Sequence, residues 1–192
     1  MRYREAAERL AAHRREIARL RRQMRAVRRE AEPEEVEDYR FRTSDGEVHL
    51  SDLLGGKEYL FVIHNMGRSC PNCTMWADGF NGVLSHLEDR AAFVVSSPDD
   101  PATQRVIAGE RGWNFRMVSH RGSSFAADMG YRSDAGWLPG VSVFRRVGNR
   151  ILRVSDSDFD EGDDFCAVWH FLDLLPEGPA GWRAKLSYQR PS

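Results

Sequence analysis

The sequence contains no long hydrophobic run: no apolar stretch approaches the ~20 residues that a helix needs to cross a bilayer. Its arginine-rich N-terminus has no apolar segment of the secretory-signal kind. Only 3 of its 192 residues are cysteines, too few for a framework of structural disulfides. The formal net charge is −1, so the overall charge indicates no particular partner. These absences favour a cytoplasmic protein with an ordinary hydrophobic core.

Two of the three cysteines stand close together in the stretch Cys70-Pro71-Asn72-Cys73. The run 57–64 before them is aromatic and β-branched at its centre, which is typical of a strand buried on both faces. Apolar residues after them recur every three or four positions, which predicts one face of a helix. These apolar residues are Cys73, Trp76, Phe80, Val83, Leu84 and Leu87. Pro71 suits the first turn of this helix, where a missing N–H costs nothing.

This strand-to-helix turn places the Cys70 thiol at the start of a helix. Unpaired N–H groups there stabilise an anion, and the thiolate is the reactive form of cysteine. We therefore expect Cys70 to be the acidified, attacking thiol and Cys73 to be more buried and to resolve a mixed disulfide. A Cys-x-x-Cys pair in this setting is typical of a thioredoxin-like redox motif.

Two other interpretations of the cysteine pair remain open. The pair can be half of a zinc site, but two more ligands are then needed. Cys166 is the only other cysteine and no spaced histidine pair follows, so we expect no metal. Two inert core cysteines are the other alternative, which the proline at the helix start disfavours.

Residues 2–31 form the second distinctive segment and read as one long helix. Apolar residues recur every seven positions, with a second series three residues later, as in a heptad seam with one polar entry, His13. The two series are Tyr3, Leu10, Ile17, Met24 and Ala31, and Ala6, His13, Leu20 and Val27. Residues 1–30 hold 11 Arg and 4 Glu, a net charge of +7, so the remainder carries −8. We expect residues 1–33 to be a dimerisation or docking arm, and the protein to be a homodimer through this helix. Nucleic-acid binding is not expected, because no base-reading motif accompanies the positive charge of this segment.

Residues 34–192 are expected to form one domain after a linker at 32–35. The pattern predicts, in order, a hairpin at 39–50, strand 57–64, the helix after Cys70, strand 91–96, helix 102–111, strand 115–119, a helical turn at 123–129, a hairpin at 141–154 and helix 163–175. Alternating strands and helices imply parallel crossover units, and the last hairpin adds antiparallel strands. The predicted fold is α/β and thioredoxin-like, a mixed central sheet with helices on both faces.

The chain also resembles a known family, the thioredoxin-like proteins described as predicted dithiol-disulfide oxidoreductases, which are still a domain of unknown function. The segments that carry the resemblance are His64-Asn65-Met66, Cys70-Pro71-Asn72-Cys73, residues 76–82, Gly112-Trp113, residues 139–144 and residues 174–178. The similarity spans about residues 39–188, and members commonly begin with a charged helix. It implies redox chemistry at the two cysteines without a bound cofactor.

The resemblance further implies a role for Leu138-Pro139. The wider superfamily places a cis-proline before the strand that faces the motif, so the Leu138 backbone is expected to pair with substrate and Pro139 to lie against the thiols. The alternative is an ordinary trans turn at Pro139-Gly140. There are departures: thioredoxins carry Trp where Ser69 stands, and peroxiredoxins carry Pro and Thr where residues 63–69 have neither.

His64, Arg68 and Trp76 are candidate auxiliary residues. His64 ends the motif strand and can move protons, although such a histidine is more often satisfied by neighbouring backbone. Arg68 can favour the thiolate by its charge or remain solvated in the loop. Asp78 is expected to make a polar contact, and Cys166 to be a small core residue. The acidic run 156–164 fails the EF-hand register, so we expect a solvated loop that caps the last helix.

The sequence thus predicts a thiol-disulfide oxidoreductase that acts on a protein or small-molecule disulfide or thiol and is served by a reductant that the residues do not identify. One alternative is a peroxiredoxin-like thiol peroxidase with Cys70 as the peroxidatic thiol. Another is a non-catalytic protein of the same fold, which either holds a metal through Cys70, Cys73 and His64 or acts as an interaction module through its basic arm.

Overall fold

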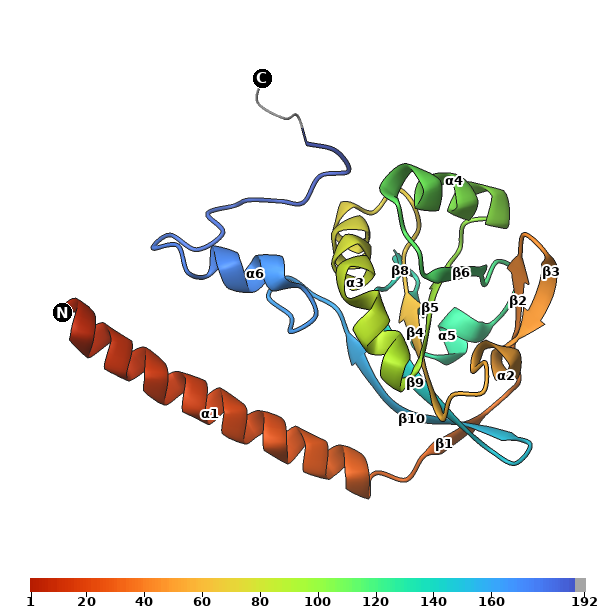
Figure 1. Cartoon of the computed structure of the whole chain (residues 1–192), viewed down its shortest axis with the longest axis horizontal. Helices are drawn as coiled ribbons and strands as arrows, with labels where there is room; N and C mark the ends of the chain where they lie inside the picture. Colours follow the sequence, from red (N-terminus) through yellow and green to blue (C-terminus); the bar gives the residue numbers. More distant parts are fainter. Residues whose placement is uncertain (189–192) are drawn as a thin grey trace. The chain divides into compact units, whose positions relative to one another are not determined.

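The computed structural model describes residues 1–188 and divides the chain into two compact units, Met1–Glu34 and Glu35–Ser192. The boundary lies one residue after the predicted one, and the last four residues of the predicted 34–192 domain lie outside the described part. Helix α1 (Tyr3–Glu30) makes up nearly all of the first unit (Figure 1). The prediction of a long N-terminal helix is confirmed.

The second unit is built on a mixed sheet in the order β1-β10-β9-β4-β5-β6-β2-β3. Its strands are β1 (Glu34–Val36), β2 (Arg40–Thr43), β3 (Gly46–His49), β4 (Tyr59–His64), β5 (Ala92–Ser97), β6 (Arg116–Ser119), β9 (Gly140–Val147) and β10 (Arg150–Asp158). The central strands β4, β5 and β6 are parallel, as expected for crossover connections through helices. The outer pairs are antiparallel hairpins, β2 with β3 and β9 with β10. This is the thioredoxin-like arrangement that the sequence predicts.

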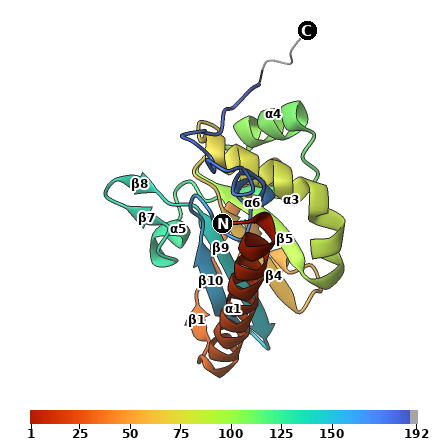
Figure 2. The ribbon, with the colours of Figure 1, turned by 90° about the vertical axis from the view of Figure 1, so that its left-hand side faces the viewer.

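Helices cover both faces of this sheet (Figure 2). One face packs against α3 (Pro71–Arg90), α4 (Pro101–Arg111) and α6 (Ala167–Leu172), and its core contains both motif cysteines. The other face packs against α2 (Leu50–Leu53) and α5 (Phe125–Asp128). Strand β4 supplies both cores, because successive side chains of a strand point to opposite faces. Its register with β5 and β9 aligns His64 with Ser96 and with Gly140, so the loops after β4 and β5 and before β9 meet at one sheet edge.

Four features differ from the predictions. The expected linker contains β1, and a small hairpin of β7 (Arg132–Ser133) and β8 (Gly136–Trp137) was not anticipated. The last helix begins at Ala167 instead of residue 163, because the Asp163 carboxylate accepts the N–H groups of Phe165 at 2.8 Å and Cys166 at 3.1 Å and holds that stretch in a turn. Part of the expected acidic loop, up to Asp158, is strand β10.

Gly140 is the position where the close packing of this edge excludes a side chain. A Cβ atom there would lie 2.7 Å from the Ser157 carbonyl oxygen and would overlap the Tyr131 ring. The ring of Tyr131 stacks on His64, and its hydroxyl donates toward the carbonyls of Val141 and Ser157. Glycine therefore allows the tyrosine to close the sheet edge on the face opposite the thiols.

Helix α1 presents its heptad residues to solvent. None of its side chains is buried, and large apolar side chains remain about half exposed, for example Leu10 at 52% and Ile17 at 47%. An amphipathic helix with an open apolar seam is typical of a coiled-coil partner. The role of this helix in a homodimer remains a prediction.

We predict that the protein is a homodimer held by α1. Ile17→Asp places a charge in the centre of the seam and should shift the protein to a monomer in analytical ultracentrifugation. Ala18→Asp is the matched control, since it adds the same charge to the adjacent, exposed position outside both heptad series. A wild-type monomer, or equal dissociation of both variants, would contradict the prediction.

Candidate active site

The two cysteines lie where β4 is followed by α3. The loop that connects β4 to α3, residues 65–70, is held by hydrogen bonds from both sides. The Asn65 side-chain oxygen accepts the N–H of Gly67 at 2.8 Å, and Asp99, in the loop after β5, accepts the N–H of Arg68 at 2.8 Å. Gly67 has a φ of +105°, and Asp99 packs against it closely. The loop thus turns sharply and delivers Cys70 to the start of the helix.

Cys70 is the N-cap residue of α3, and Pro71 occupies the first turn. The Cys70 Sγ accepts the backbone N–H of Cys73 at 3.0 Å. The pKa of Cys70 is lowered from 9.0 to about 7: the Cys73 thiol is the main cause, backbone N–H groups of Cys73 and Asn72 add to it, and burial opposes it. A substantial fraction of Cys70 is therefore thiolate at neutral pH.

Cys73 lies deeper, one helical turn further on, with 3% of its surface exposed against 9% for Cys70. Its Sγ accepts the N–H of Met66 at 3.4 Å. The pKa of Cys73 is raised well above its usual range, first by the hydrogen bond to Cys70 and then by burial. The pair therefore shares one proton, which stays on Cys73 while Cys70 is ionised.

A cavity of about 480 Å³ opens at Cys70. Its lining comes from the loop and helix start, from β8, and from two later segments: Met66, Ser69, Cys70, Pro71, Asn72, Trp137, Glu161, Arg183 and Ala184. Sequence reasoning missed Trp137, Glu161 and Arg183 as site residues. Trp137 could have been found from the sequence, because it directly precedes the Leu138-Pro139 pair. Nothing in the sequence pattern connects Arg183 with the cysteines.

The cis bond expected before Pro139 is wrong: the Leu138–Pro139 peptide is trans. The Leu138 N–H donates to the Tyr131 carbonyl at 2.9 Å, and the Pro139 carbonyl accepts the N–H of Phe159 at 3.1 Å. These internal bonds hold the chain extended as it leaves β8 for β9. They occupy the N–H of Leu138, one of the two backbone groups of the residue that the resemblance assigned to substrate pairing. Trp137, rather than Pro139, is the residue of this segment that lines the Cys70 cavity.

The interpretation of His64 as an auxiliary near the thiols is also wrong. Ile63 belongs to the core that contains the cysteines, and the next side chain along the strand, His64, points to the other face. There its Nε2 lies 2.9 Å from the Ser142 hydroxyl, and its ring stacks on Tyr131 with 3.7 Å between centroids. The Ser142 hydroxyl pairs with Nε2, where neighbouring backbone was expected, and Nδ1 is buried without a hydrogen-bond partner among the described residues.

The other auxiliary candidates are structural in their contacts. Arg68 is exposed and acts through its backbone N–H bond to Asp99. Trp76 is 3% exposed and packs on Phe159 with 5.3 Å between ring centroids, as a core residue of α3. Asp78 accepts hydrogen bonds from Arg111 and from the Trp113 indole, which confirms the expected polar contact.

Cys166 is buried at the N-cap of α6, and burial raises its pKa, so it is a poor nucleophile. Across residues 1–188, no three His, Cys, Asp or Glu side chains gather closely enough to hold a metal ion. In the same range, no helix is long and apolar enough to cross a membrane.

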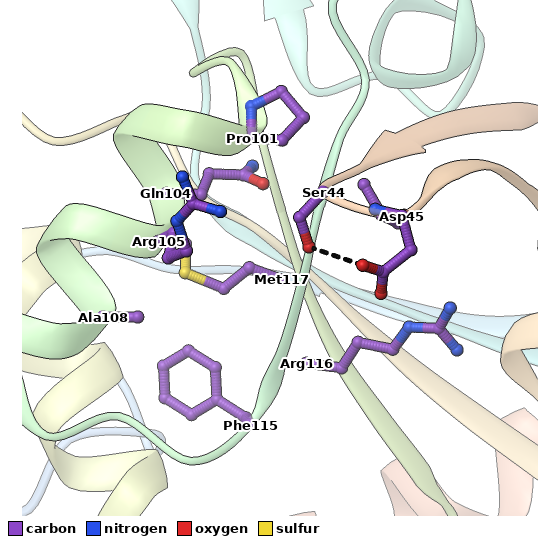
Figure 3. A pocket seen from close by; sticks show the side chains of 10 residues that line it. Ser44, Asp45, Pro101, Gln104, Arg105, Ala108, Phe115, Arg116 and Met117 are labelled. Atoms are coloured by element: carbon purple, nitrogen blue, oxygen red, sulfur yellow. Dashed lines mark hydrogen bonds between the residues drawn. The ribbon is translucent and has the colours of Figure 1, made fainter.

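A second cavity, of about 230 Å³, lies between the β2–β3 turn, α4 and β6 (Figure 3). Neither thiol lines it. The amide of its buried residue Gln104 donates to the Ser97 hydroxyl and to the Val118 carbonyl, both at 2.9 Å, and so ties α4 to the sheet. This cavity offers no reactive group comparable to Cys70.

The sequence was compared with models of known protein families. The family model "Bacterial protein of unknown function (DUF899)" matches residues 1–189. The chain is a member of this family. The match includes the residues that form α1. No curated protein matches the sequence.

Solved structures similar to this DUF899 protein include peroxiredoxins. The peroxidoxin BcpB of Mycobacterium tuberculosis is 22% identical, with a TM-score of 0.54 over 66% of this chain and 84% of that one. Peroxiredoxin Q of Xanthomonas campestris is 17% identical, with a TM-score of 0.53 over 62% and 78%. Reduced Prx3 of Vibrio vulnificus in complex with hydrogen peroxide is 12% identical, with a TM-score of 0.57 over 69% and 90%. At these identities the likeness shows the fold, and it confirms the thioredoxin-like prediction.

We predict that the acidity of Cys70 depends on Cys73. Cys73→Ala removes the thiol that donates to Cys70, so the pKa of Cys70 should rise from about 7 toward 9.0. The pH dependence of iodoacetamide alkylation, followed at the Cys70 peptide by mass spectrometry, measures it. Cys73→Ser keeps a hydroxyl donor and should retain most of the lowering. Identical midpoints in all three proteins would refute this account.

We also predict a loss of stability in acid that comes from the buried histidines. Burial first, and then the charge of Arg132, lower the pKa of His120 from 6.5 to about 4. The unfolded chain therefore binds a proton between these pH values that the folded chain does not, and stability falls as the pH falls through this window. From pH 7 to pH 5 the single group should cost about 2 kcal/mol.

Urea unfolding at the two pH values measures this cost. His120→Asn should reduce the loss between pH 7 and pH 5 by about that amount, roughly 2 kcal/mol, because no imidazole remains to be protonated. His86→Asn, at an exposed position of α3, should leave the loss unchanged. An unaltered pH dependence in His120→Asn would show that this histidine is protonated in the folded protein.

Proposed function

We propose that this protein is a thiol-disulfide oxidoreductase with Cys70 as nucleophile and Cys73 as resolving thiol. The observation that carries the proposal is the pair itself: an acidified thiol that lines a cavity at a helix start, and a protonated, deeper thiol one turn away. A dithiol of this kind holds two electrons, so no bound cofactor is required. We propose the cytoplasm as its compartment, where such a pair is kept available in its reduced form.

In the first step, the Cys70 thiolate attacks one sulfur of a substrate disulfide. A bond forms between Cys70 and that sulfur, and the other substrate sulfur leaves as a thiolate, which takes a proton from water. Cys70 then carries no negative charge. The hydrogen bond to the Cys70 thiolate, the main cause of the raised pKa of Cys73, is therefore lost at this stage.

In the second step, Cys73 loses its proton to solvent and attacks Cys70. The Met66 N–H, 3.4 Å from the Cys73 Sγ, stabilises the thiolate that forms. The Cys70–Cys73 disulfide forms and the second substrate sulfur leaves as a thiol. The substrate has gained two electrons and the protein has lost two, and an external dithiol restores the reduced pair by the reverse exchange.

A thiol peroxidase is the second candidate, favoured by the fold shared with peroxiredoxins. Cys70 would then attack one peroxide oxygen and keep it as a sulfenic acid, while the O–O bond breaks and the other oxygen leaves as an alcohol or water. Cys73 would condense with the sulfenic acid to a disulfide and release water. The residues before Cys70 count against it, because residues 63–69 lack the Pro and Thr of that class. Rapid oxidation of Cys70 by peroxide, faster than by disulfides, would favour this candidate.

The test combines a reduction potential with trapping of the intermediate. Thiol trapping in glutathione buffers should give a reversible two-electron transition between roughly −270 and −120 mV. Cys70→Ser should lower disulfide turnover by roughly a thousandfold or more, since the nucleophile is lost. Cys73→Ser should accumulate a mixed disulfide on Cys70.

Cys166→Ala serves as the control, because Cys166 is buried outside the Cys70 cavity and should leave turnover unchanged. A pair that forms no disulfide over this range of potentials, together with unaltered turnover in Cys70→Ser, would overturn the proposed function.

A further inference from the structure

The cavity at Cys70 carries charges of both signs at its rim. Arg183 and Glu161 line it together, and the Arg183 Nη1 lies 3.4 Å from the Glu161 Oε1. Both side chains are largely exposed to solvent, at 80% and 52%. Two exposed charges joined by one contact contribute little to folding stability. The arrangement leaves most of the guanidinium fork and the second carboxylate oxygen available to a ligand.

Part of the remaining wall near the thiol is apolar, beside the polar residues Ser69 and Asn72. Met66, Trp137 and Ala184 line the cavity beside Cys70. Trp137 is fixed from its other contacts: Arg132 lies over its ring at 4.2 Å, and His120 packs against it with 4.8 Å between ring centroids. An indole ring held in this way is a suitable surface for sulfur atoms and methylene groups, since sulfur makes favourable contacts with aromatic rings.

The size of the cavity fits a small molecule. Its volume of about 480 Å³ lies within the range of ordinary ligand pockets, ~300–1,000 Å³. Residues after α6 close one side of it: Ala184 is buried, and the nearby Leu186 carbonyl accepts a hydrogen bond from Arg111 at 2.9 Å, which ties the segment to α4. A folded protein substrate would have to present its disulfide past this segment, whereas a small disulfide meets no such obstacle.

We propose that the substrate is a low-molecular-weight disulfide of an α-amino acid, with cystine as the simplest case. The claim rests on the proposed function and specifies its substrate class. Arg183 binds the α-carboxylate, Glu161 binds the α-ammonium, and the disulfide lies between the Trp137 ring and the Cys70 Sγ. The two charges of the substrate replace the single contact of the ion pair with two charge-assisted hydrogen bonds.

The reaction balances without further groups. Cys70 takes one half of cystine as a mixed disulfide and releases the other half as cysteine. Cys73 then displaces the second cysteine and closes the Cys70–Cys73 disulfide. One cystine gains two electrons and two protons, and a dithiol reductant returns the protein to its starting state.

Four disulfides of different charge test the claim on the full-length protein, with dithiothreitol as the reductant and kcat/KM as the readout. Cystine carries both charges, cystamine only ammonium groups, dithiodipropionate only carboxylates, and bis(2-hydroxyethyl) disulfide none. We expect cystine to be the best of the four, by about tenfold over the uncharged compound, as one good charge-assisted contact would give.

The charge variants then assign each contact. Arg183→Met should lower kcat/KM by about tenfold for cystine and dithiodipropionate and leave the uncharged disulfide unchanged. Glu161→Gln should do the same for cystine and cystamine. Arg150→Met is the matched control: it breaks an ion pair of equal length, 3.4 Å from Glu35, at the opposite end of β10 from the site.

The possible outcomes separate this claim from the proposed function. Turnover of the uncharged disulfide as fast as cystine, or an unchanged kcat/KM for cystine in both variants, overturns the substrate class while the oxidoreductase stands. Failure to turn over any of the four disulfides, together with a Cys70–Cys73 pair that forms no disulfide in the glutathione buffers, overturns the proposed function itself. Faster reduction of a protein disulfide than of cystine would likewise refute the small-substrate claim.

Discussion

One hydrogen bond organises the candidate site, the donation from the Cys73 N–H to the Cys70 Sγ at 3.0 Å. It exists because α3 starts at Pro71 and leaves its first amide groups without helical partners. The same turn sets the second thiol one helical turn deeper, where it donates to the first. A shift of the helix start by one residue would remove both effects together. The loop contacts of Asn65 and Asp99 matter because they prevent such a shift.

The sheet separates two kinds of buried polar chemistry. The thiols lie on the face of α3, α4 and α6, and the stacked pair of His64 and Tyr131 lies on the other. Burial lowers the pKa of His64 well below its usual value, so this imidazole is neutral at pH 7. A neutral ring across the sheet adds no positive charge near the thiolate. The acidity of Cys70 therefore comes from groups within its own helical turn.

Local sequence was sufficient for the motif and most of the sheet, and it was insufficient wherever a distant residue decided the outcome. The position of Cys70 followed from short-range rules, the strand before it and the proline after it. The orientation of His64 could have been anticipated from alternation along β4, once Ile63 was assigned to the cysteine face. The trans bond at Pro139 depends on Tyr131 and Phe159, and the shortened last helix on the side chain of Asp163. The role of Arg183 at the cavity arises only from tertiary folding, because 110 residues separate it from Cys73.

The segment around Ala184 has a consequence for how the protein is made. The ribosome completes the Cys70–Cys73 pair long before it adds the residues that close the cavity. During that interval the nascent chain carries both thiols without this outer wall, so they are open to any disulfide in the surroundings. Synthesis in a reducing compartment, where disulfides are scarce, protects the unfinished chain. Because the cysteines are translated before the segment that covers them, a reducing environment during synthesis favours recovery of the protein with both thiols intact.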